Sequence, residues 1–204
     1  MTDRSCPNCG AALPAILAHA RMVNCAFCGS SIVLDDATLR LAGRAGEMLD
    51  APELIELARP VRLPQGVFTA RGHVRYDYGR GHWDEYHGDL DGDLVWVSVD
   101  EGDVVLQRPL ADPPQGARTL FRLGATLRVM GLDYTCTEVA TARAAAFRGQ
   151  LPEAIVVGEA HLYANFAGPR GAILSGEAWT LPGGEEAIAW FHGHWIDPFA
   201  VRPA

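Results

Sequence analysis

The chain has 204 residues and a formal net charge of −8, and all 17 of its basic residues are arginine. Because 49% of the residues are hydrophobic and only 21% are charged, the composition excludes a disordered chain and suits one main core with a small appendage. Residues 1–20 lack the basic and apolar regions of a secretory signal, and the longest apolar runs fall well short of the roughly 20 residues that span a bilayer. We therefore expect a cytoplasmic protein that is not an integral membrane protein.

Two matched cysteine motifs open the chain. Each is a C-x-x-C-G sequence, and 15 residues separate the two pairs, which is typical of a four-cysteine zinc ribbon. Gly10 and Gly29 follow the pairs where the backbone must turn sharply. A closed set of four thiolates leaves zinc no open position, so one structural Zn²⁺ is expected rather than a redox or catalytic site. The predicted metal ligands are Cys6, Cys9, Cys25 and Cys28.

Zinc ribbons often bind nucleic acid, but this one lacks the necessary charge. Residues 1–34 contain Arg4 and Arg21 against Asp3, and Phe27 is their only aromatic residue. A basic footprint with aromatic residues for base stacking is therefore missing from this segment. A nucleic-acid partner is disfavoured, and a structural or protein-docking ribbon is favoured.

Residues 35–64 have the composition of a linker between the ribbon at 1–34 and a larger domain at 65–204. Glycine and proline interrupt two short amphipathic segments, Thr38–Met48 and Pro52–Ala58. Both segments are predicted to be short helices, with Pro52 in a first helical turn.

The sequence after Gly66 is rich in short β-type segments. Asp91-Gly92-Asp93 and Glu101-Gly102-Asp103 separate apolar runs and predict tight hairpins. The pattern indicates a mainly β domain, an antiparallel sandwich or barrel. Similar segments at Phe68–Tyr76 and Leu127–Thr135 leave open a duplication with halves at about 65–110 and 117–204. The predicted strands are Val67–Tyr78, Leu94–Val99, Val104–Leu106, Leu120–Val129, Tyr134–Ala144, Ala154–Val157, Ala160–Phe166, Ala172–Leu174 and Ala187–His192.

Several motifs of this domain resemble a known family. A glycine-led strand from Gly72 reaches the turn Gly79-Arg80-Gly81 and then Trp83-Asp84-Glu85-Tyr86; Trp96, Tyr134–Glu138 and Gly149–Pro152 continue the likeness. Over about residues 66–195 the chain resembles the bacterial domain of unknown function 4178, whose members often carry a zinc ribbon ahead of the domain. The resemblance implies this architecture and no catalytic residues. The sequence departs from the family pattern at His87-Gly88 and at Gln150, where an acidic residue is more usual.

Two carboxylates stand out among the predicted strands. Trp83 and Glu85 are two residues apart and share one face of a strand, and the same period places Glu138 with Tyr134 and Cys136 on another strand. One interpretation is structural, with Arg75 across the hairpin as the ion-pair partner of Glu85. The other is a ligand-binding or acid/base carboxylate.

The remaining chemistry-bearing residues carry weaker signals. His82 and His87 flank the tryptophan motif, and His192 and His194 form an H-x-H pair, but no third metal ligand accompanies them at a fixed spacing. Cys136 lies in an apolar segment and is expected to be a buried thiol.

Together these features predict a zinc-binding, non-catalytic bacterial accessory protein that works through protein contacts. The alternative is a small-ligand binder or enzyme that uses a groove lined by Glu85, Glu138 and the histidines. Convergence of these side chains on one concave site would favour the alternative.

Overall fold

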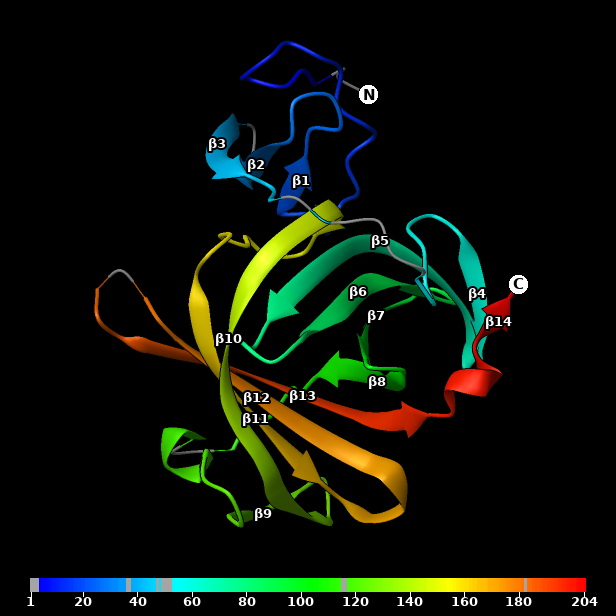
Figure 1. The fold of residues 1–204 in the computed structure, drawn as a ribbon, viewed down its shortest axis with the longest axis vertical. Helices are drawn as coiled ribbons and strands as arrows, with labels where there is room; N and C mark the ends of the chain where they lie inside the picture. The colour runs from blue at the N-terminus through cyan, green and yellow to red at the C-terminus, as the bar shows by residue number, and fades with distance from the viewer. Residues whose placement is uncertain (1–3, 36–37, 47, 49–52, 115–116, 182) are drawn as a thin grey trace.

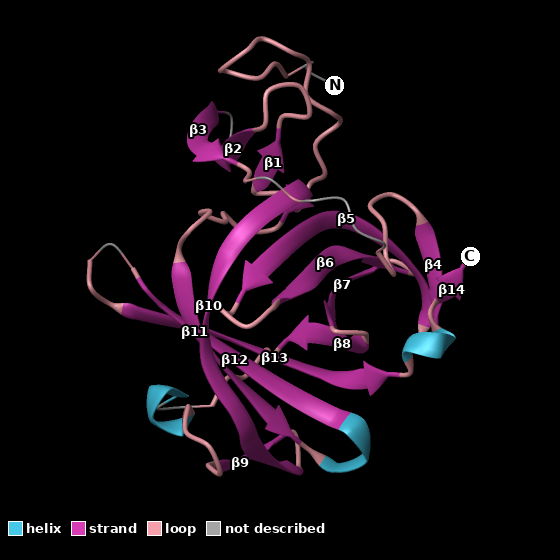
Figure 2. Cartoon of the chain, viewed as in Figure 1, coloured by secondary structure: helices cyan, strands magenta, loops and turns pink. Residues whose placement is uncertain are grey.

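The computed structural model describes residues 4–35, 38–46, 48, 53–114, 117–181 and 183–204, and the expected mainly β fold is confirmed (Figures 1 and 2). All strand pairings are antiparallel, and none of the described helices has the length and apolar character needed to cross a bilayer. The strands are β1 (Met22–Asn24), β2 (Ser30–Asp35), β3 (Thr38–Arg44), β4 (Pro60–Leu63), β5 (Gly66–Asp77), β6 (His82–Leu90), β7 (Asp93–Asp100), β8 (Asp103–Pro109), β9 (Thr126–Val129), β10 (Leu132–Leu151), β11 (Ala160–Ala167), β12 (Ala172–Thr180), β13 (Glu186–Ile196) and β14 (Arg202–Pro203). Short 3-10 helices occupy η1 (Ala117–Leu120), η2 (Pro169–Gly171) and η3 (Pro198–Ala200).

Eight of these strands pair in a closed circuit. The order is β5-β6-β7-β8-β13-β12-β11-β10, and β10 pairs again with β5. Figure 1 shows the strands of the circuit curving around a common centre, with β1–β3 above them. The circuit therefore has an inner and an outer face, and side chains alternate between the two along each strand.

Strand β10 closes the circuit because it changes partners along its 20 residues. It pairs with β11 up to Arg143, with β5 from Arg143 to Gly149, and with β1 at Gln150 and Leu151. Gly72 and Gly149 face each other where β10 leaves β5. A Cβ atom on Gly72 would lie 2.3 Å from the Gln150 carbonyl oxygen, so the close approach requires glycine at that position.

The cysteine ribbon is attached to the larger domain through this same strand end. Gln150 accepts a hydrogen bond from Leu17 N at 2.8 Å and donates one from Nε2 to Ala15 O at 2.9 Å. Arg21 N also donates to Leu151 O. An amide can donate and accept at once, whereas a carboxylate only accepts, so glutamine at 150 suits this junction.

The helices predicted for the linker are wrong in the part that the structure describes. Thr38–Arg44 forms β3, which pairs with β2, and Gly43 has a φ of +127° that a helix does not allow. Residues 53–59 form irregular turns, and Pro52 lies outside the described residues. β3 pairs with the edge of β2, and this pairing overrides the weak helical pattern of the sequence.

The hairpin predictions are confirmed. Asp91-Gly92 and Glu101-Gly102 form two-residue turns with positive φ at both positions, the turn geometry whose twist matches that of the flanking strands. The strand predicted at Ala154–Val157 is wrong: this segment is a loop whose Ile155 and Val157 pack on a core cluster. Its apolar residues reflect packing rather than strand pairing.

Apolar clusters lie on both faces of the sheet. On β7, Val95 and Val97 belong to one cluster, whereas Trp96 between them belongs to a second. Segments outside the circuit cover the first cluster through Ile55 and Val61, and a third cluster includes Phe121. The first and third clusters lie on the outer face, whereas the second cluster lies on the inner face, where Trp83 and Tyr163 adjoin polar side chains.

The junction at Gln150 gives a testable prediction. In Gln150→Glu the bond to Ala15 O is lost and a carboxylate faces a carbonyl oxygen, so the ribbon attachment should weaken by about 1–3 kcal/mol. Hydrogen exchange at Arg21 N, which bonds across the junction, should accelerate accordingly. Gln65→Glu, an exposed change in the β4–β5 turn, is the matched control, and equal exchange in the two variants would contradict this role of Gln150.

Candidate functional site

The four ribbon cysteines form a cluster that could hold a metal ion. Their sulfur atoms all lie within 4.8 Å of one another, with 3.7 Å between Cys6 Sγ and Cys28 Sγ and 3.8 Å between Cys9 Sγ and Cys25 Sγ. It is the only such group of Cys, His, Asp or Glu among the described residues. The predicted set of ligands is therefore brought together.

Local backbone geometry builds this cluster. Gly10 N donates to Cys6 O at 2.9 Å and Gly29 N donates to Cys25 O at 2.8 Å, which closes each knuckle. Both glycines have positive φ, as their place after the cysteine pairs predicted. Ser30 Oγ lies 3.2 Å from Cys28 Sγ, where a hydroxyl can donate to a thiolate.

A cavity of about 170 Å³ lies inside the circuit of strands. Side chains from seven of the eight circuit strands line it, and only β5 contributes none. Trp83, Glu85 and Glu138 all line this cavity, so the structure brings together the two carboxylates that the sequence singled out. Tyr86 does not: it lies on the opposite face, 1% exposed, with its ring stacked on His73 at 4.2 Å.

Glu85 sits in a sparse polar network. Its Oε1 accepts hydrogen bonds from Trp83 Nε1 at 3.0 Å and from Ser98 Oγ at 3.2 Å. Gln107 Nε2 in turn donates to Ser98 Oγ at 3.4 Å. Burial raises the pKa of Glu85 to about 7 against these hydrogen bonds, which favour the ionised form.

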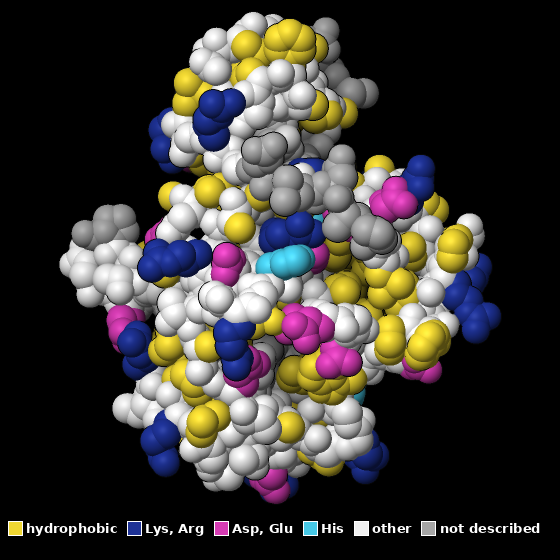
Figure 3. Space-filling view, in the orientation of Figure 1, with side chains coloured by type: hydrophobic (Ala, Val, Ile, Leu, Met, Phe, Trp, Pro, Cys, Tyr) yellow, Lys and Arg dark blue, Asp and Glu magenta, His cyan; other side chains and the backbone are white. Residues whose placement is uncertain are grey.

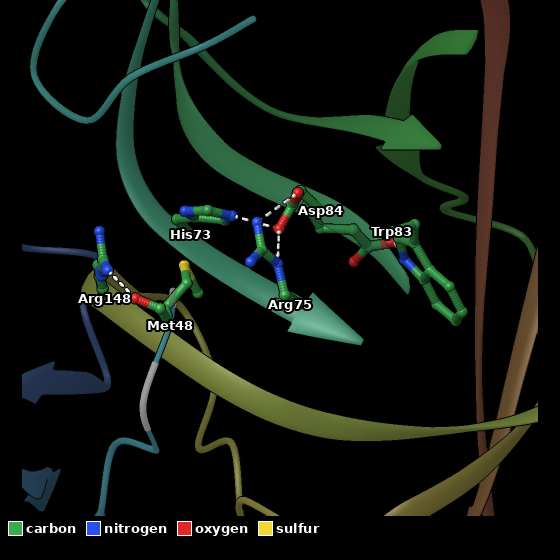
Figure 4. Close-up of polar contacts among 7 residues, drawn as sticks. Met48, His73, Arg75, Trp83, Asp84 and Arg148 are labelled. Atoms are coloured by element: carbon green, nitrogen blue, oxygen red, sulfur yellow. Dashed lines mark hydrogen bonds and ion pairs between the residues drawn. The ribbon is translucent and has the colours of Figure 1, made fainter. Parts of the chain in front are cut away.

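The expected ion pair between Arg75 and Glu85 is wrong. Strand register places Arg75 opposite Asp84, and Arg75 donates to both carboxylate oxygens of Asp84 at 2.8 and 3.0 Å. Figure 4 shows Asp84 meeting His73 and Arg75, with Trp83 farther along the strand; Arg148 bonds the Met48 carbonyl nearby. Side chains alternate along β6, so the guanidinium and Glu85 lie on opposite faces.

Glu138 has a denser network than Glu85. Tyr163 OH donates to Glu138 Oε1 at 2.9 Å, and Asn165 Nδ2 donates to Oε2 at 3.0 Å. Ser175 Oγ donates to Asn165 Oδ1 at 2.9 Å, which extends the row across three neighbouring strands. Both oxygens of Glu138 are therefore held in fixed positions.

The two-residue period of a strand predicted that Glu138 shares a face with Tyr134 and Cys136, and this prediction is wrong. The pairing of β10 with β11 shifts by one residue between Cys136 and Glu138. This bulge turns Glu138 into the cavity, while Cys136 and Tyr134 pack in the third apolar cluster. The buried thiol expected at Cys136 is confirmed.

A second cavity of about 460 Å³ adjoins the first. Glu177 lines both, and Glu153, His161, Tyr76 and Trp179 also line the second. Burial, followed by the nearby charges of Glu85 and Glu153, raises the pKa of Glu177 well above its ordinary value. Burial also lowers the pKa of His161 to about 4, so its ring is neutral at physiological pH.

The histidines expected beside the carboxylates line neither cavity. His82 is exposed, and His87 packs against Trp96 with its ring 5.3 Å from that of His19. His192 and His194 are likewise absent from both linings. His161, Glu177 and Asn165 take their place, and the sequence reasoning missed all three. The available signal was the alternation of Ser175 and Glu177 with the apolar residues of the same strand.

These features define a class of protein in which a four-cysteine ribbon is joined to a closed antiparallel sheet with polar side chains inside. The family model for a domain of unknown function, DUF4178, matches residues 61–198, more than half of the chain. The chain belongs to this family, as its motifs predicted. No curated protein and no solved structure matches it.

The raised pKa of Glu85 predicts a pH-dependent difference in stability. Between roughly pH 4.5 and 7 the unfolded chain loses this proton while the folded chain keeps it, so the wild type should lose stability as pH rises, by at most about 1.4 kcal/mol per unit. Glu85→Gln lacks this ionisation, so its stability relative to the wild type should increase across that range and level off above it. Urea unfolding at pH 5 to 8 measures the difference.

Glu56→Gln, at an exposed carboxylate that pairs with Arg59, is the control for the Glu85 comparison. The variants share the ribbon, so any effect of pH on metal binding cancels in the comparison. A Glu85→Gln difference that does not change with pH would show that Glu85 titrates like an ordinary exposed carboxyl.

Proposed function

We propose that the protein is a non-catalytic binding protein whose ribbon holds a structural Zn²⁺ and whose sheet encloses a small molecule. The convergence of Glu85 and Glu138 on one internal cavity, through separate hydrogen-bond networks, carries this proposal. Ligand sites are typically concave, with a few placed polar groups among apolar and aromatic side chains. Trp83, Trp195 and Tyr163 supply the aromatic part here.

Binding is favoured over catalysis by the chemistry of the lining. The described residues that line the first cavity include no cysteine, histidine or arginine, so a thiol nucleophile or an imidazole base has no candidate there. Both oxygens of Glu138 are already engaged by Tyr163 and Asn165. Such groups orient a ligand more readily than they transfer its protons.

Zinc is the metal that best suits the cysteine cluster. Four sulfurs at the Zn–S distance of about 2.3 Å in a tetrahedron lie about 3.8 Å apart. The Sγ pairs of Cys6 with Cys28 and of Cys9 with Cys25 lie 3.7 and 3.8 Å apart. With four protein ligands the ion would stabilise the fold and bind no substrate. A reducing compartment such as the bacterial cytoplasm would keep these thiols available.

Purified protein should contain one zinc per chain, and Cys25→Ser should lose most of it because three thiolates leave the tetrahedron incomplete. Elemental analysis under reducing, metal-replete conditions measures the content. Cys136→Ser, which alters the one cysteine outside the cluster, should retain the metal. Less than about half an equivalent in the wild type, or equal loss in both variants, would sink this assignment.

The ligand cavity can be tested with the five tryptophan indoles as reporters. In ¹H–¹⁵N spectra of the intact zinc-loaded protein, bound fragments should shift the indoles of Trp83, Trp179 or Trp195, which line the cavities. The indoles of Trp96 and Trp190, which line neither, should stay unchanged. A fragment library that spans anions, cations and neutral molecules and moves none of the three lining indoles would contradict a ligand-binding function.

A protein-docking ribbon is the second candidate. Phe27 lies inside the second knuckle and is 82% exposed, which suits an apolar contact with a protein partner. Nucleic acid fits less well, because arginines on the face shown in Figure 3 are dispersed among acidic side chains. Phe27→Asp should abolish binding of a protein partner to the ribbon. Phe199→Asp, at a residue 85% exposed outside the ribbon, should leave that binding intact.

A further inference from the structure

The described residues that line the two adjoining cavities include acidic side chains but no arginine or lysine. Glu85 and Glu138 line the first cavity, Glu153 and Glu159 line the second, and Glu177 lines both. Among the described residues that line either cavity there is no arginine, and the chain has no lysine. Carboxylates in an enclosed site require a counter-charge, a proton or a set of hydrogen bonds.

Glu177 has neither a counter-charge nor a hydrogen bond within the described protein, so without a ligand its raised pKa leaves it protonated. No hydrogen bond or ion pair connects its side chain to a described residue, in contrast to Glu85 and Glu138. Its strand partner across the sheet is Tyr163, whose hydroxyl is committed to Glu138. An unpartnered carboxylate between two cavities marks the point where a ligand would make its strongest polar contact.

His161 supplies a second, independent indication. Its Nε2 atom is buried and has no hydrogen-bond partner among the described residues, although the side chain lines the second cavity. The neutral ring packs edge-on against Tyr76, with 5.1 Å between centroids. An imidazole nitrogen without a proton accepts hydrogen bonds, and an ammonium group donates them.

Aromatic rings complete the site. Trp83 stacks on Tyr76 at 5.1 Å and meets Tyr163 edge-on at 5.0 Å, and Trp179 lines the second cavity. The faces of such rings attract cations, most strongly where water is excluded. Aromatic walls with interior carboxylates are therefore complementary to an organic cation with an apolar body.

We propose that the adjoining cavities bind a small organic cation, an amine of the alkylammonium type, with Glu177 as its principal counter-charge and His161 as a polar contact. The inference rests on the proposed ligand-binding function and names the class of ligand. A bare metal ion fits less well. Metal binding needs several ligand atoms close together, and among the described residues only the ribbon cysteines meet that condition.

A matched series of probes tests the charge. Hexylammonium, hexan-1-ol and hexanoate share a chain and differ in charge, and Mg²⁺ and Ca²⁺ are tested alone. Calorimetry at pH 7 with the intact zinc-loaded protein should show hexylammonium binding at least tenfold more tightly than hexan-1-ol, and no binding of hexanoate. The indoles of Trp83 and Trp179 should shift with the amine.

Glu177→Gln should lower the hexylammonium affinity at least tenfold and leave hexan-1-ol unaffected. Glu56→Gln, the same change outside both cavities, should leave the series as in the wild type. If Glu177→Gln fails to fold, Glu153→Gln at the second cavity should give a smaller loss in the same direction.

The possible failures are distinguishable. Binding of hexan-1-ol or hexanoate as tight as that of the amine, with the same indole shifts, would overturn the cation assignment and keep the ligand-binding function. Binding of Mg²⁺ or Ca²⁺ that depends on Glu177, without amine binding, would also overturn it. If no probe of this series moves the lining indoles, the cation assignment fails, and if the fragment library moves none of them either, the ligand-binding function fails as well.

Discussion

The closing pairing between β10 and β5 is the constraint on which the rest of the structure depends. It joins the two ends of an eight-strand circuit, so each circuit strand has a circuit neighbour on both sides along part of its described length. It also surrounds one face of the sheet, which shields Glu85 and Glu138 on that face from bulk water in part. The same strand then continues into pairing with β1, which fixes the cysteine ribbon at the end of the circuit.

The carboxylates on the inner face differ in how many of their oxygens the protein hydrogen-bonds. Glu138 has both oxygens hydrogen-bonded, Glu85 uses one, and Glu177 uses none within the described protein. At Glu138 hydrogen bonds therefore compensate for the removal of the carboxylate from water, whereas at Glu177 this compensation is left to a proton or a ligand. A protein under selection for stability alone would replace Glu177 with an apolar or amide side chain.

Local signals in the sequence were sufficient for the features that depend on local geometry. The knuckle spacing predicted the cysteine cluster, and Asp91-Gly92 and Glu101-Gly102 predicted the hairpins. The other features depend on which distant strands pair, and the local sequence does not contain that information. The bulge before Glu138 and the placement of Arg75 opposite Asp84 each depend on strand register. A register shift of one residue moves every side chain to the other face of the sheet. Alternation on β12 showed a polar and an apolar face, but only closure of the circuit decides which face is enclosed.

A ¹³C NMR titration of the glutamate side-chain carboxyls in the folded protein measures burial on the inner face directly, because it needs no ligand. Glu85 should titrate near pH 7 and Glu177 well above the ordinary range of a glutamate. If Glu85 and Glu177 instead titrate in the ordinary range of exposed glutamates, the inner face is open to water and these carboxylates are not buried in an acidic site.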